Sequence, residues 1–163
     1  MIVILRGPSC VGKTTIGKHI SLKYKYYFID ADSYHSRKSI IKMKKGISIN
    51  DGERFFWLKR INKKVQFIHK KEKKIIIACS ALKSKYIKLI LDDLKTKIYI
   101  ISLYGDFKNL KKRSLLRKNH FFNSSLIKNQ LLNYQFPMKK FYKIRCTESF
   151  DRVRNKIEKK ILN

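Results

Sequence analysis

The chain has 163 residues, 44% of them hydrophobic, and its 40 Lys and Arg against 11 Asp and Glu give a formal net charge of +29. This length suits one compact core, and the apolar content excludes a disordered chain. Three scattered cysteines exclude a disulfide framework and a CxxC zinc pair, while no apolar run approaches the ~20 residues of a membrane span. We therefore expect one domain, residues 1–163, in a reducing cytoplasmic compartment and without a membrane.

The excess of positive charge has two explanations. Basic proteins attract anionic partners such as nucleic acid. Alternatively, a genome biased toward A and T produces lysine at solvent-facing positions without selecting any partner. We favour the second explanation, because the lysines are spread over every segment together with abundant Ile, Asn and Tyr. A nucleic-acid partner is therefore not expected.

Short apolar runs rich in β-branched residues alternate with longer stretches of helical spacing along the chain. No linker rich in Pro, Ser or Gly interrupts this order. The alternation is typical of a parallel sheet covered by helices, the α/β class. The five runs are Ile2 to Leu5, Tyr26 to Ile29, Ile75 to Cys79, Ile98 to Leu103 and Phe141 to Cys146.

Two of the predicted helices have a clear apolar stripe. One runs from about Glu53 to Lys70, and the other follows a candidate N-cap, Thr147, near the C-terminus. Residues three or four apart share one face of a helix, so we expect the stripes to be core rather than cofactor sites. They consist of Trp57, Ile61, Val65 and Ile68 in the first helix, and of Phe150, Val153, Ile157 and Ile161 in the second.

The segment after the first predicted strand fits the phosphate-binding pattern G-x-x-x-x-G-K-[ST]. A helix is expected to begin near Lys13, so its N-terminal amide groups and positive dipole would face bound phosphate. Lys13 would reach the β- and γ-phosphates of ATP, and Thr14 would bind Mg²⁺. A strand-to-helix turn with a chance glycine is the alternative. The residues expected to hold the nucleotide are Gly7, Ser9, Val11, Gly12, Lys13, Thr14 and Thr15.

Two carboxylates, Asp30 and Asp32, follow the second predicted strand. Ligands of open α/β sheets bind beyond the carboxyl ends of the strands, where these side chains would lie. Asp30 could complete the magnesium site, and Asp32 could orient or deprotonate an acceptor hydroxyl. Alternatively, an aspartate here forms an Asx turn that caps the next helix, and the two interpretations can hold for different aspartates.

These segments and several others resemble, in the same order, the gluconokinase family, which belongs with shikimate kinase among the small P-loop metabolite kinases. The resemblance covers about residues 1–137 and implies a three-layer P-loop kinase fold with a five-stranded parallel sheet and a mobile lid. It also implies ATP and Mg²⁺, D-gluconate as the substrate, 6-phospho-D-gluconate as the product, and a homodimer. The matching blocks are GPSCVGKTT from Gly7, DADSYH from Asp30 with Arg37, KMKKGISINDGERFFWL from Lys42, CSALKSKY from Cys79, LYGDF from Leu103, RSLLRKNHFF from Arg113 and QFP from Gln135.

The resemblance assigns the acceptor pocket to several of these blocks. Arg54 would bind the gluconate carboxylate through the planar two-donor geometry of its guanidinium group. A surface ion pair of Arg54 with Glu53 or Asp51 is the alternative. Cys79 is expected to be a buried residue rather than a nucleophile, because phosphoryl transfer needs no covalent intermediate. The other residues placed at the acceptor are Asp32, His35, Arg37, Ser80, Lys83 and His120.

The block from Arg113 resembles the lid of the family, at about residues 113–125. Closure of a lid over ATP excludes water and can bring arginines to the transferring phosphoryl group. The resemblance therefore implies Arg113 and Arg117 as nucleotide-binding residues, with Arg117 also catalytic and Lys118 beside it. Both arginines could instead be solvated, since they lie four residues apart on a predicted helix.

The chain also departs from the family pattern. Ile87, Lys88 and Leu91 replace an Arg-Asp pair and a further Arg. Leu132 and Phe136 stand where acidic residues are usual. Three alternatives therefore stay open: a kinase of the same fold with another acceptor such as shikimate or a nucleoside monophosphate, a nucleic-acid-binding P-loop protein, and a decayed enzyme with slow turnover.

Overall fold

The computed structural model describes residues 1–72, 74–117, 120–137 and 141–162. Five strands in this part of the chain form one sheet in the order β2-β3-β1-β4-β5, and every pairing is parallel. Each strand begins and ends within one residue of a predicted run, so the predicted parallel sheet is confirmed. The strands are β1 Ile2–Arg6, β2 Tyr27–Asp30, β3 Ile75–Cys79, β4 Ile98–Tyr104 and β5 Phe141–Arg145.

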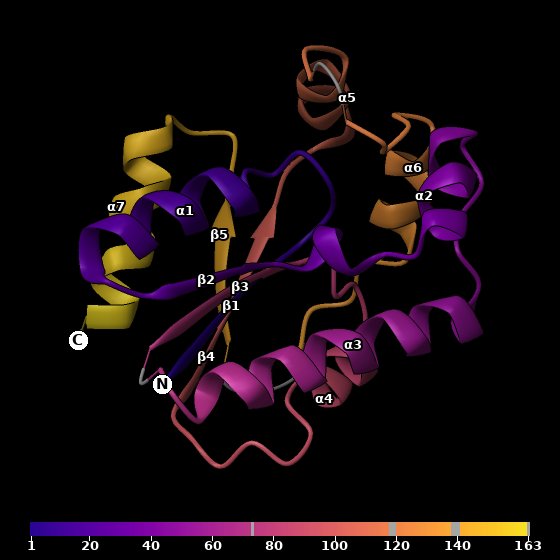
Figure 1. The fold of residues 1–163 in the computed structure, drawn as a ribbon. Coiled ribbons are helices and arrows are strands. Elements are labelled where there is room, and N and C mark those ends of the chain that lie inside the picture. Colours follow the sequence, from indigo (N-terminus) through magenta and orange to yellow (C-terminus); the bar gives the residue numbers. More distant parts are fainter. Residues whose placement is uncertain (73, 118–119, 138–140, 163) are drawn as a thin grey trace.

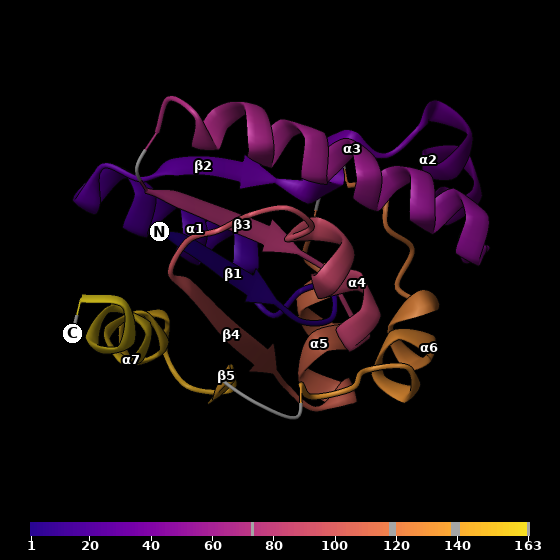
Figure 2. The ribbon, with the colours of Figure 1, turned by 90° about the horizontal axis from the view of Figure 1, so that it is seen from below.

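Helices cover both faces of the sheet and make a three-layer α/β fold (Figures 1 and 2). The helices α1 (Lys13–Tyr24) and α7 (Phe150–Leu162) pack on one face. The helices α3 (Asp51–His69) and α4 (Ser84–Ile90) pack on the other. Since every connection between neighbouring parallel strands must return along the sheet, this layering follows from the alternation in the sequence.

The central strand β1 contributes to both layers of the core. Successive side chains of a strand point to opposite faces of its sheet. Val3 and Leu5 therefore pack with residues of α1 and α7, whereas Ile2 and Ile4 pack with residues of α3 and α4. All four side chains are fully buried. Burial on both faces explains why this strand is apolar at consecutive positions rather than at alternate ones.

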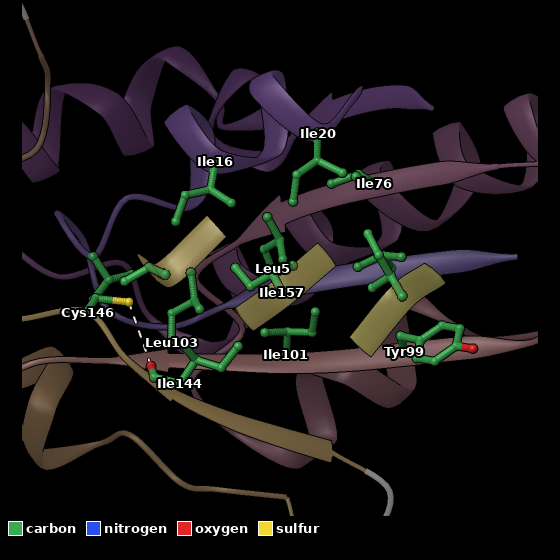
Figure 3. Packing of buried hydrophobic residues seen from close by; sticks show 14 of the residues in the cluster. Leu5, Ile16, Ile20, Ile76, Tyr99, Ile101, Leu103, Ile144, Cys146 and Ile157 are labelled. Atoms are coloured by element: carbon green, nitrogen blue, oxygen red, sulfur yellow. Dashed lines mark hydrogen bonds between the residues drawn. The ribbon is translucent and has the colours of Figure 1, made fainter. Parts of the chain in front are cut away.

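Figure 3 shows the core between the sheet and the layer of α1 and α7. Ile16 and Ile20 of α1 lie in one cluster with Ile157 of α7 and with Leu5 and Ile101 of the sheet. Full burial of each such side chain stabilises the fold by roughly 1.5–3 kcal/mol. This core holds the first turn of α1, and with it the phosphate-binding segment, against the sheet.

The helix α3 begins with a capping box. Asn50 Oδ1 accepts a hydrogen bond from Glu53 N, and the Glu53 carboxylate accepts one from Asn50 N. These two bonds satisfy backbone donors at the helix start and fix its first turn. The predicted stripe of this helix, from Trp57 to Ile68, is buried as expected.

No helix in the described part of the chain is both long and apolar enough to cross a membrane.

The C-terminal helix differs from its prediction in two details. Ser149 rather than Thr147 precedes α7, and Ser149 Oγ accepts from Arg152 N at 3.5 Å, so the predicted cap is wrong. The chain uses residues 146–149 to turn after β5, which moves the start of the helix beyond Thr147. Phe150 is 40% exposed rather than buried. The rest of the predicted stripe is buried: Val153, Ile157 and Ile161.

Four further helices gather beyond the carboxyl ends of the strands (Figure 1). They are the 3₁₀ helix η1 (Ala31–Tyr34), α2 (Arg37–Lys44), α5 (Phe107–Leu115) and α6 (Leu126–Leu132). A small apolar cluster of Met43, Ile49 and Leu126 joins α2 to α6. In open α/β sheets this edge binds the ligands, so the candidate site lies here.

Candidate active site

The segment between β1 and α1 has the backbone of a phosphate-binding loop. Gly7 and Gly12 have φ angles of +147° and +95°, which favour glycine. A Cβ atom on Gly7 would lie 2.2 Å from the carbonyl oxygen of Leu103, so only glycine fits beside β4. Gly7 therefore shapes the base of the loop, whereas the residues after it form the wall of a cavity.

Lys13 lies inside this loop. Its Nζ donates hydrogen bonds to the carbonyl oxygens of Gly7 at 2.9 Å and Pro8 at 2.8 Å. Burial lowers the pKa of Lys13, and the negative charge of Asp32 opposes this effect. The ammonium group is thus held at the centre of the loop, where it can meet phosphate oxygens.

Thr14 and Asp30 meet at the carboxyl end of β2. Thr14 Oγ1 donates to Asp30 Oδ2 at 2.9 Å, and Asp30 Oδ1 accepts from Asp32 N at 3.1 Å. Asp30 therefore caps η1, as the Asx-turn alternative requires, and also presents an oxygen beside the loop. A hydroxyl and a carboxylate fit Mg²⁺, which takes few protein ligands and shares the rest with phosphate and water.

The loop opens into a cavity of about 320 Å³, which we call the phosphate-loop cavity. Ser9 to Ile16 form one wall of it, so the predicted residues Ser9, Val11, Gly12, Lys13, Thr14 and Thr15 lie together. Arg113 and Arg117 line the same cavity, and Arg117 Nη1 lies 3.9 Å from Cys10 Sγ. The sequence did not single out the remaining lining residues Cys10, Ile16, Cys146, Glu148, Phe150 and Val153 for this cavity.

A second cavity of about 210 Å³ lies between α3 and α6, and we call it the α3–α6 cavity. Five residues expected at the acceptor line it: Asp32, His35, Arg54, Ser80 and Lys83. Ser9 and Asp32 line both cavities, so the two meet at these residues. The wall of this cavity also includes Asp51, Trp57, Tyr86, Phe121, Phe122, Asn129, Gln130 and Asn133.

Asp32 stands where the two cavities meet. Burial raises the pKa of its carboxyl group, while the positive charge of Lys13 counteracts this rise. His120 Nε2 lies 3.8 Å from Asp32 Oδ2, and His120 Nδ1 accepts a hydrogen bond from Phe122 N at 3.1 Å. A carboxylate of raised proton affinity between two cavities is suited to accept a proton from a bound hydroxyl.

Arg54 reaches the α3–α6 cavity from the first turn of α3. Its Nη2 donates to the carbonyl oxygen of Ile49 at 3.1 Å, and its guanidinium carbon lies 5.2 Å from the centre of the Tyr86 ring. Arg54 Nε is buried and has no hydrogen-bond partner among the described residues. Asp51 approaches Nε only to 4.0 Å, and Glu53 pairs with Lys42 instead. The guanidinium group therefore keeps a donor for an anionic ligand.

His35 forms an aromatic wall of the same cavity. Its ring stacks on Trp57 with centroids 4.3 Å apart, and Phe121 meets it edge-on at 5.9 Å. Burial, with the positive charges of Arg54 and Arg60, lowers the pKa of His35 to about 4. His35 is therefore neutral at physiological pH and can offer a ring nitrogen for hydrogen bonding without carrying charge.

Three other predicted residues, Arg37, Cys79 and His120, line neither cavity in the part of the chain that the structure describes. Arg37 is exposed at the start of α2 and lines neither cavity. His120 lies near the α3–α6 cavity through its approach to Asp32. Cys79 is fully buried in β3, and burial raises the pKa of its thiol to about 12, as expected of a core residue. The prediction for Lys118 concerns a residue outside those that the structure describes.

Three residues that depart from the family pattern, Ile87, Leu132 and Phe136, differ in their burial and contacts. Ile87 is buried in the core beneath α4, and Leu132 is 79% exposed at the end of α6. The Phe136 ring contacts the rings of Tyr104 and Tyr134. None of these three residues lines either cavity within the described part of the chain.

Similar proteins are found by sequence and by structure. The model of the shikimate kinase family matches residues 9–162. A probable gluconokinase from Dictyostelium discoideum is 38% identical over 142 residues, which cover 84% of this chain and 71% of that protein. A sugar kinase from Janibacter sp., solved without ligand, aligns with a TM-score of 0.86 and 25% identity over 97% of this chain and 92% of its own. A gluconokinase structure from Sinorhizobium meliloti gives a TM-score of 0.80 and 26% identity over 94% and 86%.

Proposed function

The chain belongs to the gluconokinase family, within the wider shikimate kinase family, and we propose that it transfers the γ-phosphoryl group of ATP to D-gluconate. The products are 6-phospho-D-gluconate and ADP. The chain is thus a kinase with a small-molecule substrate. Its phosphate loop, with Lys13 at the centre, is the donor-binding part that such a reaction requires.

One observation carries this proposal: Asp32 and Ser9 line both cavities. A phosphoryl transfer needs the donor phosphate and the acceptor hydroxyl in adjoining sites, with their reacting atoms in line. The phosphate loop lines the larger cavity, and Arg54, whose Nε donates no hydrogen bond within the described part of the chain, lines the smaller one. ATP in the first cavity and a small acid in the second would therefore meet beside Asp32.

In the phosphate-loop cavity, the backbone from Gly7 to Thr15 binds the phosphates, and Lys13 exchanges its two carbonyl partners for phosphate oxygens. Thr14 and Asp30 hold Mg²⁺, which neutralises phosphate charge when bound. Arg113 and Arg117 also line this cavity and bind the nucleotide, and Arg117 stabilises charge on the transferring group.

In the α3–α6 cavity, Arg54 binds the carboxylate of gluconate with paired donors. Ser80, Lys83 and His35 contribute polar contacts around the polyol chain, and His120 reaches it from beside Asp32. Asp32 orients the reacting hydroxyl and accepts its proton as the bond to phosphorus forms. Arg37 lies outside the cavity in this conformation, so its acceptor role would need a movement of α2.

The larger organisation of the protein is part of the same proposal. Residues 1–163 act as one P-loop kinase domain, and residues 113–125 form a lid that closes over ATP and keeps water from the phosphoryl group. The protein works as a homodimer in the cytoplasm. Light scattering after size-exclusion chromatography tests the homodimer directly, since a monomer of this chain has half the mass.

The test of the function is ADP release from Mg-ATP by the purified protein, with and without D-gluconate. Shikimate and several nucleoside monophosphates serve as competing acceptors. We expect release that depends on D-gluconate and exceeds release with every other acceptor. A dependence on one of the other acceptors would reassign the substrate, and ATP binding without stimulation by any acceptor would reject the kinase reaction proposed for this chain.

A further inference from the structure

The side chain of Gln130 connects the phosphate loop to the α3–α6 cavity. Ser9 N donates a hydrogen bond to Gln130 Oε1 at 2.7 Å, and both residues line the α3–α6 cavity. Ser9 lines the phosphate-loop cavity as well. Gln130 therefore lies on the wall where the two cavities meet, which Asp32 also lines.

This hydrogen bond determines which way the Gln130 amide faces. An amide oxygen accepts hydrogen bonds, and its NH₂ group donates two. Because the Ser9 N–H group holds Oε1, the donors on Nε2 are the hydrogen-bonding capacity that Gln130 offers to a ligand. Gln130 thus keeps both amide donors for a ligand of the α3–α6 cavity, whose wall it lines.

The side-chain amide of Asn129, next to Gln130 on α6, also has its oxygen bound by the protein. Asn129 Oδ1 accepts from Asn133 Nδ2 at 2.8 Å, and both asparagines line the α3–α6 cavity. The NH₂ group of Asn129 is therefore the part of that amide left to donate. Two adjacent amides, Asn129 and Gln130, each have the oxygen engaged by the protein and the donors available.

The helix that carries these amides is attached to the core at both ends. Ile127, in the first turn of α6, is fully buried in the cluster beneath α1 and α7. After α6, Gln135 N donates to Leu82 O at 2.8 Å, and the buried Arg6 donates from Nη1 to Gln135 O at 2.7 Å. Since these contacts fix the backbone on either side of Gln130, its amide is positioned before any acceptor binds.

We propose that Gln130 is an acceptor-binding residue that couples the acceptor to the phosphate loop. Its Oε1 holds the Ser9 N–H group, and its Nε2 donates to a hydroxyl oxygen of the polyhydroxy acid. Because Ser9 belongs to the phosphate loop, this hydroxyl lies next to the one that receives the phosphoryl group. The inference rests on the proposed gluconate kinase function and adds a residue that sets the register of the acceptor between Arg54 and the phosphate loop.

The kinetic test compares Gln130→Met and Gln130→Glu with the wild-type protein. Methionine keeps the length of the side chain without hydrogen bonds, whereas glutamate keeps an oxygen for Ser9 N but lacks the NH₂ group. Gln130→Met leaves Ser9 N without its acceptor and should lower the melting temperature, whereas Gln130→Glu keeps that bond and should leave the KM for ATP nearly unchanged. We expect the KM for D-gluconate to rise ~10-fold in Gln130→Met, as loss of one hydrogen bond to the substrate implies. In Gln130→Glu the rise should be larger, because a carboxylate repels the anionic substrate.

The control is Gln66→Met on α3, which makes the same change of side chain. The Gln66 amide donates to Asp92 O, and Gln66 lines neither cavity among the described residues. It should leave both KM values unchanged. A merely structural role for Gln130 would reduce the fraction of active protein and so lower the maximal rate at an unchanged KM for D-gluconate. That result in an active protein would overturn the inference.

A binding measurement separates this inference from the proposed function. In ¹⁵N-labelled protein with Mg-ADP, the side-chain amide signals of Gln130, assigned by their loss in Gln130→Met, should shift when D-gluconate is added. A shift without turnover would support the acceptor contact and reject the kinase reaction. Turnover without a shift would reject the contact alone, and the absence of both would reject both.

Discussion

The two cavities are built in different ways, although they share Ser9 and Asp32. One continuous segment, Ser9 to Ile16, supplies the main wall of the phosphate-loop cavity. The α3–α6 cavity combines residues of η1, α3, the segment after β3, and α6, which are far apart in the sequence. Phosphate can be bound by the backbone of one loop and one helix end, whereas a polyhydroxy acid needs converging side chains from several elements.

This difference predicts how substitutions will act. A change at the phosphate loop should reduce turnover whatever the acceptor, because the donor phosphates are common to every reaction of the enzyme. A change in the α3–α6 cavity should act mainly on the KM for D-gluconate and leave nucleotide binding intact. A substitution that broke this division would show that the two cavities are energetically one site.

The substitution Lys13→Ala should abolish turnover without unfolding the protein. The substitution removes the ammonium group at the centre of the loop, which turnover requires. Burying a charged lysine costs free energy of desolvation, so removing the Lys13 side chain should not lower the melting temperature. ADP release and thermal unfolding measure the two effects. The matched control is Lys18→Ala on the exposed side of α1, and near-normal activity of Lys13→Ala would reject the assignment of the loop.

The substitution Asp32→Asn should lower kcat ~10²- to 10⁴-fold, the usual contribution of a positioned general base. Asparagine has nearly the same shape but cannot accept the proton of the hydroxyl. The KM for ATP should change little, because the phosphate loop is untouched. Asp93→Asn changes an exposed aspartate outside both cavities and controls for the loss of one charge. A kcat reduced less than tenfold would assign proton removal to another group.

The substitution Arg54→Lys should raise the KM for D-gluconate ~10- to 100-fold, as expected for the loss of one hydrogen bond to a charged group. Lysine keeps the charge but not the planar pair of donors. The neutral polyol sorbitol gives a sharp comparison, because it lacks the carboxylate. If Arg54 binds the carboxylate, the substitution should have little effect on any reaction with sorbitol, and an equal effect on both acceptors would contradict the assignment.

The fold and the phosphate-loop cavity could be predicted from the sequence because their signals are local. The five strands are consecutive apolar runs, and the loop is a single pattern of spaced glycines with Lys13 and Thr14. Asp30 and Asp32 were placed by the rule that ligands bind at the carboxyl ends of parallel strands. These expectations depend on neighbours in the sequence, so one chain without relatives is enough to state them.

The rest of the site depends on contacts between distant segments. Gln130 meets Ser9 across 121 residues, and an amide on a short helix carries no pattern of its own. Phe150 fits the apolar stripe of its helix, yet it lies at the first turn and faces the phosphate-loop cavity. The roles of His35 and Arg54 were suggested only by the family resemblance. Side chains that converge in space leave no regular spacing for a single sequence to reveal.

The substitution His35→Phe tests the surroundings of the acceptor through stability rather than turnover. The pKa of His35 is about 4 in the folded protein, against about 6.5 for a free histidine. The unfolded chain therefore binds more protons between these values, so stability is present above pH 6.5 and is lost as the pH falls toward 4. Phenylalanine keeps the stack on Trp57 without this titration. From pH 7 to pH 5 the wild-type protein should lose up to about 2 kcal/mol more than the variant, measured by urea unfolding. From pH 8 to pH 7 the free energies of unfolding of the two proteins should change in parallel. If they stay parallel down to pH 5, water reaches the His35 ring, and the α3–α6 cavity is more open than its aromatic wall suggests.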